Sequence, residues 1–477
     1  MRGVSEKERR SPDRSGAQFY NVAMQWFDAN FRAEARENLR LAGPLIAAQL
    51  AGVGMGVVDT IWAGRLGSQT LAAVAVGTNL NVIFFVFFMG MLMACSPIVA
   101  HRAGAGEADA RVGGFVRETQ LLALLLGAIW VIAAHLVAAP VLLHLGLEPA
   151  TAQIAVDFLR AFSWSGLGTA QWFVLRFTAE GVGVTAPTFY SGLLGLATNA
   201  LLDWILMYGK FGFPAMGAIG CGWATTISSV LMAALMAWQF RSNVKLRALH
   251  VFGGRPSGRR FLSEVHEVLK LGLPIALTLV AEASLFVVAA MLMASFGDRT
   301  VAAYQVAINF ASVLFMIPLG IALATTVRVG HAAGAGLPWM ARARGRVGMQ
   351  LGLINAASNA LIMLVFPGVI VAIYTEDTAI ATQAIVFLWL AAAFQFFDGL
   401  QVTANGALRG MKDTRVPMLI TVAAYWLIGM PSAVALGFHT TLAAEGIWWG
   451  LTIGLGIAAI GLSLRFLHGA KASVVMP

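Results

Sequence analysis

Four acidic residues lie inside long apolar stretches of the chain: Asp59, Asp203, Glu282 and Asp398. A carboxylate at the centre of a bilayer costs about 2.5–3.5 kcal/mol on insertion scales, so each acid is expected to face a protein interior or water. Acids in such positions bind ions, carry protons or attract cationic ligands. For any single acid, the alternative is a structural hydrogen bond between two helices.

Two of these acids belong to a polar set in the N-terminal half of the chain. Asp203 follows Asn199 by four residues, so both side chains lie on one face of a helix. Asp59 and Thr225 come from other apolar segments, which we expect to face this pair. Carboxylate, amide and hydroxyl oxygens suit a hard cation such as Na⁺, and two close carboxylates can instead share a proton. A helix-packing contact between Asn199 and Asp203 is the structural alternative.

The other two acids belong to polar stripes in the C-terminal half. The expected members are Glu282, Gln305, Asn309, Gln395, Asp398 and Asn405. Their spacing follows the period of a helix, and we expect the stripes to surround Glu282. Phe394, Phe396 and Phe397 flank Asp398, and aromatic rings beside an acid can hold flat organic cations. Because the chain has 29 phenylalanines, a core or lipid-facing role for Phe394 and Phe397 is equally consistent with the sequence.

The elements that position these residues are predicted membrane spans. The chain has 477 residues, of which 58% are hydrophobic and 12% charged, and its mean hydropathy is +0.77. An ordinary soluble protein is about 25% charged, so the composition predicts an all-α polytopic membrane protein. Cys95 and Cys221 lie far apart in apolar runs, which supports neither a disulfide framework nor a structural metal site. The net charge of +9 resides mainly in loops, where it indicates membrane topology rather than nucleic-acid binding.

Twelve apolar segments are long enough to cross a bilayer, which requires about 20 residues. They are 41–62, 71–99, 119–139, 153–175, 188–208, 217–240, 268–296, 301–326, 347–373, 383–408, 416–437 and 443–467. Of the 32 Lys and Arg residues, 28 lie on the side that holds both chain ends, and Arg160 lies within a span. Only Arg65, Lys210 and Arg299 lie on the other side. This asymmetry predicts that both termini are cytoplasmic.

The chain contains an internal repeat with an offset of 230 residues. RLAGPLIA (40–47) corresponds to KLGLPIAL (270–277), and HRAGAG (101–106) corresponds to HAAGAG (331–336). Each repeat holds six spans, so we expect two six-helix lobes related by a pseudo-two-fold axis along the membrane normal. The predicted division is an N-terminal segment 1–38, an N-lobe 39–240, a basic cytoplasmic linker 241–267, a C-lobe 268–468 and a cytoplasmic tail 469–477.

The N-terminal segment carries an apolar stripe at helical spacing, formed by Tyr20, Met24, Phe27 and Phe31. The stripe predicts a helix at the membrane interface before the first span. A simple anchoring role is favoured over a role in docking or gating.

A two-lobe repeat of this kind is the plan of a transporter, with its cavity between the lobes. The sequence has no GxxxxGK[ST] motif and no soluble segment long enough to hold a nucleotide, which leaves a secondary transporter rather than an ATP-driven pump. A membrane-embedded enzyme would need paired His/Asp or Ser/His sets at one depth, and none is found. A channel is disfavoured because the repeat has no filter-like loop.

Four segments carry a family resemblance: GVVDTIWAGRLG (56–67), GLPIALTLVAEASLF (272–286), the run 301–336 and FQFFDGLQVTANGALRGMKDTRVP (394–417). Through them the chain resembles the multidrug and toxic compound extrusion (MATE) family, most closely its NorM-like branch, across nearly all of residues 40–465. The resemblance implies a V-shaped pair of lobes that alternates access and exports small organic cations in exchange for Na⁺ or H⁺. It further implies no cofactor, a bacterial inner-membrane location, contact with membrane lipids and a monomeric state.

The resemblance also assigns roles to residues of the N-terminal half. The family's N-lobe acid falls on Asp59, its Asn/Asp pair on Asn199 and Asp203, and its threonine on Thr225. These four residues are therefore expected to bind the coupling cation or proton. No structural metal is implied, and any Na⁺ there would be transient.

In the C-terminal half, the NorM-like acids fall on Glu282 and Asp398. His101 and His331 occupy positions where many relatives carry glutamine, and loop packing is favoured over pH sensing for both. The main functional alternative is a flippase for a lipid-linked saccharide in the same superfamily. Such a protein would favour arginines inside its cavity, whereas Arg160 is the only basic residue predicted within a span.

Overall fold

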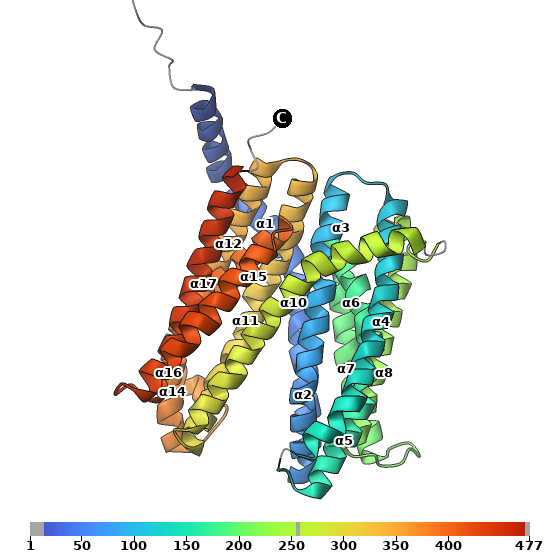
Figure 1. Cartoon of the computed structure of the whole chain (residues 1–477), viewed down its shortest axis with the longest axis vertical. Coiled ribbons are helices and arrows are strands. Elements are labelled where there is room, and N and C mark those ends of the chain that lie inside the picture. The colour runs from blue at the N-terminus through green and yellow to red at the C-terminus, as the bar shows by residue number, and fades with distance from the viewer. Residues whose placement is uncertain (1–13, 145, 254–257, 473–477) are drawn as a thin grey trace, which may run out of the picture.

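The computed structural model describes residues 14–144, 146–253 and 258–472, and side chains from 31 to 469 apart from 145 and 254–260. Within these ranges the regular structure is helical and contains no strand. Figure 1 shows the helices gathered into two lobes, one blue to green and the other yellow to red. The prediction of an all-α membrane protein with two six-helix lobes is confirmed.

The N-lobe is formed by the first eight helices. They are α1 (Arg14–Arg65), α2 (Ser68–Met93), α3 (Cys95–Gly104), α4 (Asp109–Leu142), α5 (Pro149–Ser163), α6 (Ser165–Gly181), α7 (Ala186–Tyr208) and α8 (Ala218–Ser242). A short helix, α9 (Val244–Ala248), follows and leads toward the second lobe. Its N-cap is Asn243, whose side chain accepts hydrogen bonds from the backbone N–H groups of Lys245 and Leu246.

The C-lobe repeats this plan. Its elements are α10 (Gly258–Ala294), α11 (Asp298–Gly334), α12 (Pro338–Val365), α13 (Pro367–Ala372), α14 (Thr378–Gly410), α15 (Arg415–Val422), the π-helical turn η1 (Ala423–Gly429), α16 (Met430–Phe438) and α17 (Ala444–Ala472). The helices α15, η1 and α16 follow one another without a break and form one span.

Eleven helices in the described residues are long and apolar enough to cross a membrane. The one remaining predicted span, 153–175, corresponds to α5 and α6, and the helix is interrupted between them at Trp164. Neither piece reaches 18 residues, since they hold 15 and 17. Hydropathy places this span correctly but does not detect the break.

The first helix of each lobe begins earlier than the sequence suggested. Segment 18–31, expected as a separate interfacial helix, is continuous with α1, and Figure 1 shows the start of α1 projecting beyond the bundle. The side chains of Tyr20, Met24 and Phe27 lie outside the described residues. Likewise, the last ten residues of the expected linker, 258–267, are the first turns of α10.

The two lobes pack closely in the half of the molecule that carries the start of α1 and the end of α17, here called the termini end (Figure 1). A Cβ atom added to Gly90 of α2 would clash with the backbone of Ala276 of α10. The corresponding clash would occur between Gly320 of α11 and Ile46 of α1, at the 230-residue offset. Glycine therefore permits two symmetry-related helix crossings between the lobes. Toward the opposite end the ribbons of the lobes diverge (Figure 1).

Candidate functional site

The N-lobe polar set converges on one point between three helices. Asp59 comes from α1, Asp203 from α7 and Cys221 from α8. One carboxylate oxygen of each acid and the Sγ atom of Cys221 lie within 4.8 Å of one another. The sequence predicts that the two acids lie together, but it does not predict that the Cys221 thiol lies beside them. The available signal was that Cys221 precedes Thr225 by four residues and so shares its helix face.

Hydrogen bonds fix the neighbouring residues of this N-lobe site. Nδ2 of Asn199 donates to Oγ1 of Thr225 at 3.3 Å, which ties α7 to α8. The Thr225 hydroxyl in turn donates to the carbonyl oxygen of Cys221 at 3.2 Å. The predicted grouping of Asn199 and Thr225 with the acids thus agrees with the geometry, while their role in ion binding remains a prediction.

Several buried oxygens of the N-lobe site lack a hydrogen-bond donor among the described residues. They are Oδ1 of Asp59, Oδ1 of Asn199 and both carboxylate oxygens of Asp203. Asn199 and Asp203 are fully buried. Because an unpaired buried carboxylate costs free energy, this site favours an added proton or cation.

The C-lobe acids lie in a separate cavity of about 50 Å³. Its lining comes from α10, α11 and α14 and consists of Glu282, Phe286, Ile308, Ala311, Ser312, Phe315, Phe394, Gln395 and Asp398. One water needs about 10–15 Å³ by such a measure, so the cavity has room for only a few waters. Gln395 is held in place by donating from Nε2 to the carbonyl oxygen of Ala311 at 2.7 Å, while its Oε1 has no partner among the described residues.

Four predicted residues do not line this cavity: Gln305, Asn309, Phe397 and Asn405. Gln305 and Asn309 are exposed, and Oδ1 of Asn309 accepts a hydrogen bond from the Tyr374 hydroxyl at 3.1 Å. Asn405 is buried seven residues beyond Asp398 on α14, which is about 10 Å along a helix. The spacing of these polar residues predicts which face of the helix they share. It does not predict how far along the helix the cavity extends.

Buried basic residues differ from the prediction that Arg160 alone lies within a span. The Arg160 side chain is 42% exposed beside Asp157. In contrast, Arg176 is buried in α6 and its Nε lies 2.7 Å from Glu180 Oε1. Arg409 is buried near the end of α14, where Nη1 contacts Sδ of Met93 at 3.1 Å. Neither arginine lines the C-lobe cavity.

The two predicted surface histidines instead join the lobes at the termini end. His101 of α3 donates from Nε2 to the carbonyl oxygen of Gly410, at the end of α14, over 2.7 Å. His331 of α11 donates in the same way to Gly181, at the end of α6, also over 2.7 Å. Both histidines lie within helices and not in loops, so the expected placement is wrong, while the choice of a packing role over pH sensing stays a prediction. Their bonds form a near-symmetric pair across the lobe interface.

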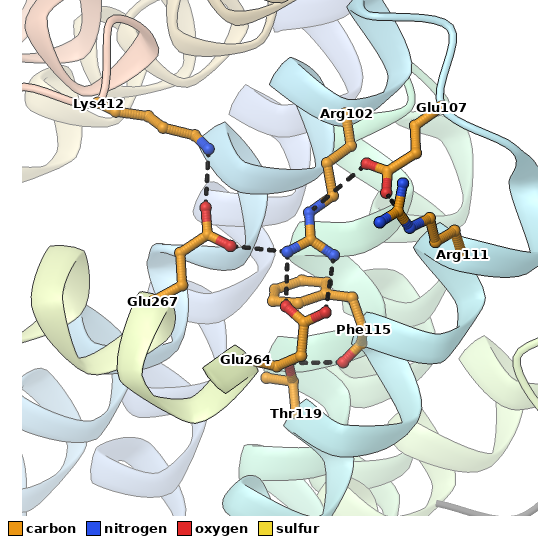
Figure 2. A network of polar contacts seen from close by, with 8 residues as sticks. All are labelled: Arg102, Glu107, Arg111, Phe115, Thr119, Glu264, Glu267 and Lys412. Carbon is orange, nitrogen blue, oxygen red and sulfur yellow. Dashed lines mark hydrogen bonds and ion pairs between the residues drawn. The ribbon is translucent and has the colours of Figure 1, made fainter. Parts of the chain in front are cut away.

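Ion pairs reinforce the same interface, as Figure 2 shows. The guanidinium of Arg102, on α3, contacts Glu264 at 2.5 Å and Glu267 at 2.6 Å, both on α10. Glu267 also binds Nζ of Lys412, which follows α14, at 2.8 Å. The guanidinium of Arg102 lies 4.5 Å from the ring centre of Phe115. The π electrons of the ring stabilise the positive charge of the guanidinium.

A related contact lies on the other side of the pseudo-two-fold axis. Glu34 of α1, which corresponds to Glu264 at the 230-residue offset, pairs with Arg328 of α11 and lies 3.5 Å from Arg344 of α12. Together, the histidine bonds and these ion pairs are called the seam below. Its histidine bonds are near-symmetric, whereas its arginines differ, since Arg102 corresponds to Ala332 and Arg328 to Ile98 at the 230-residue offset.

Comparisons with known proteins agree with this architecture. The MatE family model matches residues 44–205 and 274–435, two segments whose starts and ends are each 230 residues apart. Among curated relatives, the probable multidrug resistance protein NorM of Xanthomonas campestris is 40% identical, covering 92% of this chain and 95% of that protein. The multidrug resistance protein PmpM of Pseudomonas aeruginosa is 38% identical over 92% of both chains.

Solved structures share the fold at lower sequence identity. One described as the outward-facing conformation of a multidrug resistance MATE family transporter has a TM-score of 0.84 and 20% identity, covering 93% of this chain and 97% of that one. The eukaryotic MATE transporter AtDTX14 has a TM-score of 0.81 at 21% identity, covering 94% of this chain and all of that one. The matched repeats, the two lobes and the curated relatives show that the chain belongs to the MATE family, in its NorM-like branch. It is therefore a multi-pass membrane transporter and not an enzyme.

Proposed function

We propose that this chain is a secondary active antiporter of the bacterial inner membrane that exports cationic, lipophilic compounds in exchange for Na⁺ or H⁺. The observation that carries the proposal is that each lobe brings together its own pair of acids in a different setting. The names of the curated relatives, which are multidrug resistance proteins, support organic compounds as the exported class. The transporter acts as a monomer surrounded by lipid and needs no cofactor.

The N-lobe site takes the coupling ion. Asp59, Asp203, Asn199 and Thr225 offer the oxygen ligands that a hard cation prefers, and the two acids can alternatively accept protons. The unpaired oxygens support this role, because an entering cation or proton would satisfy them. Occupation of the site would change the interaction between α1 and the α7–α8 pair, and so bias the conformation of α1.

The C-lobe cavity takes the exported cation. Glu282 and Asp398 supply negative charge, and Phe286 and Phe394 supply aromatic surface for a flat cation. Oε1 of Gln395 is free to accept a hydrogen bond from the compound. At about 50 Å³ the cavity is too small for a drug, so α10, α11 and α14 must separate when the compound enters.

The seam keeps the cytoplasmic side closed in this conformation. The excess of Lys and Arg on the side of the chain ends supports a cytoplasmic location for the termini end, and hence for the seam. The exported compound would then leave from the opposite, diverging end. To admit a compound from the cytoplasm, the lobes must break the paired histidine bonds and the ion pairs.

A flippase for an anionic lipid-linked substrate fits the C-lobe cavity less well. Its lining contains two acids and no basic residue, whereas a phosphate would require positive charge. The buried Arg176 lies outside this cavity and is already paired with Glu180.

Efflux of ethidium from energised bacteria that lack their main pumps tests the proposal. Cells that produce the protein should lose ethidium faster than cells with an empty vector, and steps in Na⁺ or pH should identify the coupling ion. A protein that is well inserted but exports no organic cation, tested also with a quaternary ammonium and an acridine dye, would contradict it.

A further inference from the structure

Cys221 gives the N-lobe site a ligand that an exchange of Na⁺ or H⁺ does not need. It is one of two cysteines in the chain, and both are buried and free. Its Sγ atom lies within 4.8 Å of a carboxylate oxygen from Asp59 and from Asp203. Cys95, in contrast, lies on α3 and has no such neighbours among the described residues.

The arrangement of ligand atoms suits a different class of ion. Hard ions such as Na⁺ prefer oxygen and gain little from a thiol, whereas Zn²⁺ and Cd²⁺ bind thiolate and carboxylate together. Zinc bonds are about 2.3 Å to sulfur and about 2.0–2.2 Å to oxygen, so ligand atoms around one ion lie about 3.5 Å apart. Ligand atoms that already lie within 4.8 Å need only a small side-chain adjustment to reach this spacing.

A second observation independently points to an unfilled ligand position. The Asp203 side chain is fully buried, its carboxylate is directed at Cys221 and Asp59, and neither of its oxygens accepts a hydrogen bond from the described residues. Oδ1 of Asn199, also fully buried, is likewise unpaired, and it can supply a fourth ligand. Asp59 is only partly buried, which leaves an ion a path to the group.

We propose that Asp59, Asp203 and Cys221 form a site for a thiophilic divalent cation, namely Cd²⁺ or Zn²⁺. On binding, the Cys221 thiol releases its proton to solvent and the sulfur bonds to the metal, with no change of oxidation state. The bound ion links α1 to α7 and α8, occupies the position of the coupling ion and stops transport. Metal binding follows from the geometry alone, whereas the arrest of transport rests on the proposed function.

The binding test uses the purified full-length protein in detergent and a titration with Cd²⁺. The parent should bind one Cd²⁺ per chain, and an ultraviolet cadmium–thiolate charge-transfer band should rise with the same stoichiometry. Cys95→Ser should keep the band, and Cys221→Ser should lose it, with Cys221→Ala as a second variant if the serine form does not elute as a monodisperse peak. Absence of the band in the parent, or its persistence in both Cys221 variants, would overturn the site.

The transport test measures inhibition of dye export in proteoliposomes, relative to the metal-free rate of each variant. The concentration of Cd²⁺ for half inhibition should rise at least about tenfold in Cys221→Ser, because a loss of 1.4 kcal/mol in metal affinity is tenfold. Equal inhibition of the parent and Cys221→Ser by Cd²⁺ would overturn the claim that metal bound at this site stops transport. If the parent exports no dye at all, the proposed function fails, while the binding titration still decides whether the metal site exists.

Discussion

The two lobes share one fold but place their acids differently. At the 230-residue offset, Asp59 and Asp203 correspond to Ala289 and Ala433, while Glu282 and Asp398 correspond to Gly52 and Gly168. Every one of these acids therefore corresponds to a small apolar residue in the other repeat. The N-lobe acids lie beside an amide, a hydroxyl and a thiol, whereas the C-lobe acids lie beside phenylalanines.

This difference supports the proposed division of work between two copies of one scaffold. Small polar ligands around the N-lobe acids suit an ion, and aromatic rings around the C-lobe acids suit an organic cation. The histidine bonds of the seam, by contrast, keep the symmetry, since His101 and His331 occupy equivalent positions and each donates to a backbone carbonyl of the other lobe. The four acids have diverged between the lobes, whereas the seam histidines have stayed alike.

The largest expected effect is the loss of export in Asp398→Asn. The substitution deletes the carboxylate that we propose as a charged partner of the organic cation. Interactions with a charged group contribute about 1.5–3 kcal/mol, which corresponds to a loss of about ten- to 150-fold. The initial rate of ethidium efflux at equal membrane abundance measures it. Asp157→Asn, the same change at a partly exposed acid of α5, serves as the control and should export normally.

The next effect is a loss of ion coupling in Asp59→Asn. The amide keeps the size of the side chain but removes the charge that we propose binds the coupling ion, so export should fall about tenfold, or 1.4 kcal/mol. The remaining export should no longer respond to the ion gradient that drives the parent, as steps in Na⁺ and pH can show. Normal export by this variant, with its ion dependence intact, would mean that the N-lobe acids serve only to hold helices together.

A smaller effect is expected at the seam. His101→Ala or His331→Ala removes one hydrogen bond between the lobes, which contributes about 1 kcal/mol and shifts the closed–open equilibrium about fivefold. The labelling rate of a cysteine placed at the buried position Ala332, in a background without Cys95 and Cys221, should rise by that factor for either variant. His468→Ala, at an exposed site near the chain end, should leave labelling unchanged. Unequal effects of the two seam histidines would show that the symmetry of the seam is not functional.

The smallest effect is expected for Gln305→Ala. Gln305 shares the periodic face of α11 with Ser312, but it is exposed and lies outside the cavity. Export should stay within about twofold of the parent, since exposed substitutions usually change free energies by less than about 0.5 kcal/mol. A loss as large as that of Asp398→Asn would place Gln305 on the path of the compound in another conformation.

Much of this architecture could be predicted from local sequence. Hydropathy locates every span, because each must present about 20 apolar residues to lipid. The repeat predicts two lobes, and the spacing of Asn199 and Asp203 predicts their common face. The cost of placing a charge in the bilayer marks Asp59, Asp203, Glu282 and Asp398 as candidates from the sequence alone.

Features that depend on contacts between distant helices could not be predicted. The seam histidines bond to carbonyl groups 309 and 150 residues away, and no local pattern encodes such partners. The inclusion of Cys221 in the N-lobe site likewise depends on how α8 meets α1 and α7. The depth of the C-lobe cavity is set by the packing of three helices, which is why Asn405 shares the stripe of Asp398 but not its cavity.

Equilibrium binding of ethidium to the purified protein tests the division between the lobes most directly. Fluorescence anisotropy would compare the parent, Asp398→Asn and Asp59→Asn, each with and without the coupling ion. The division predicts that Asp398→Asn weakens ethidium binding at least about tenfold, or 1.4 kcal/mol, while Asp59→Asn still binds ethidium but no longer responds to the ion. Loss of binding in Asp59→Asn, with full affinity in Asp398→Asn, would contradict it.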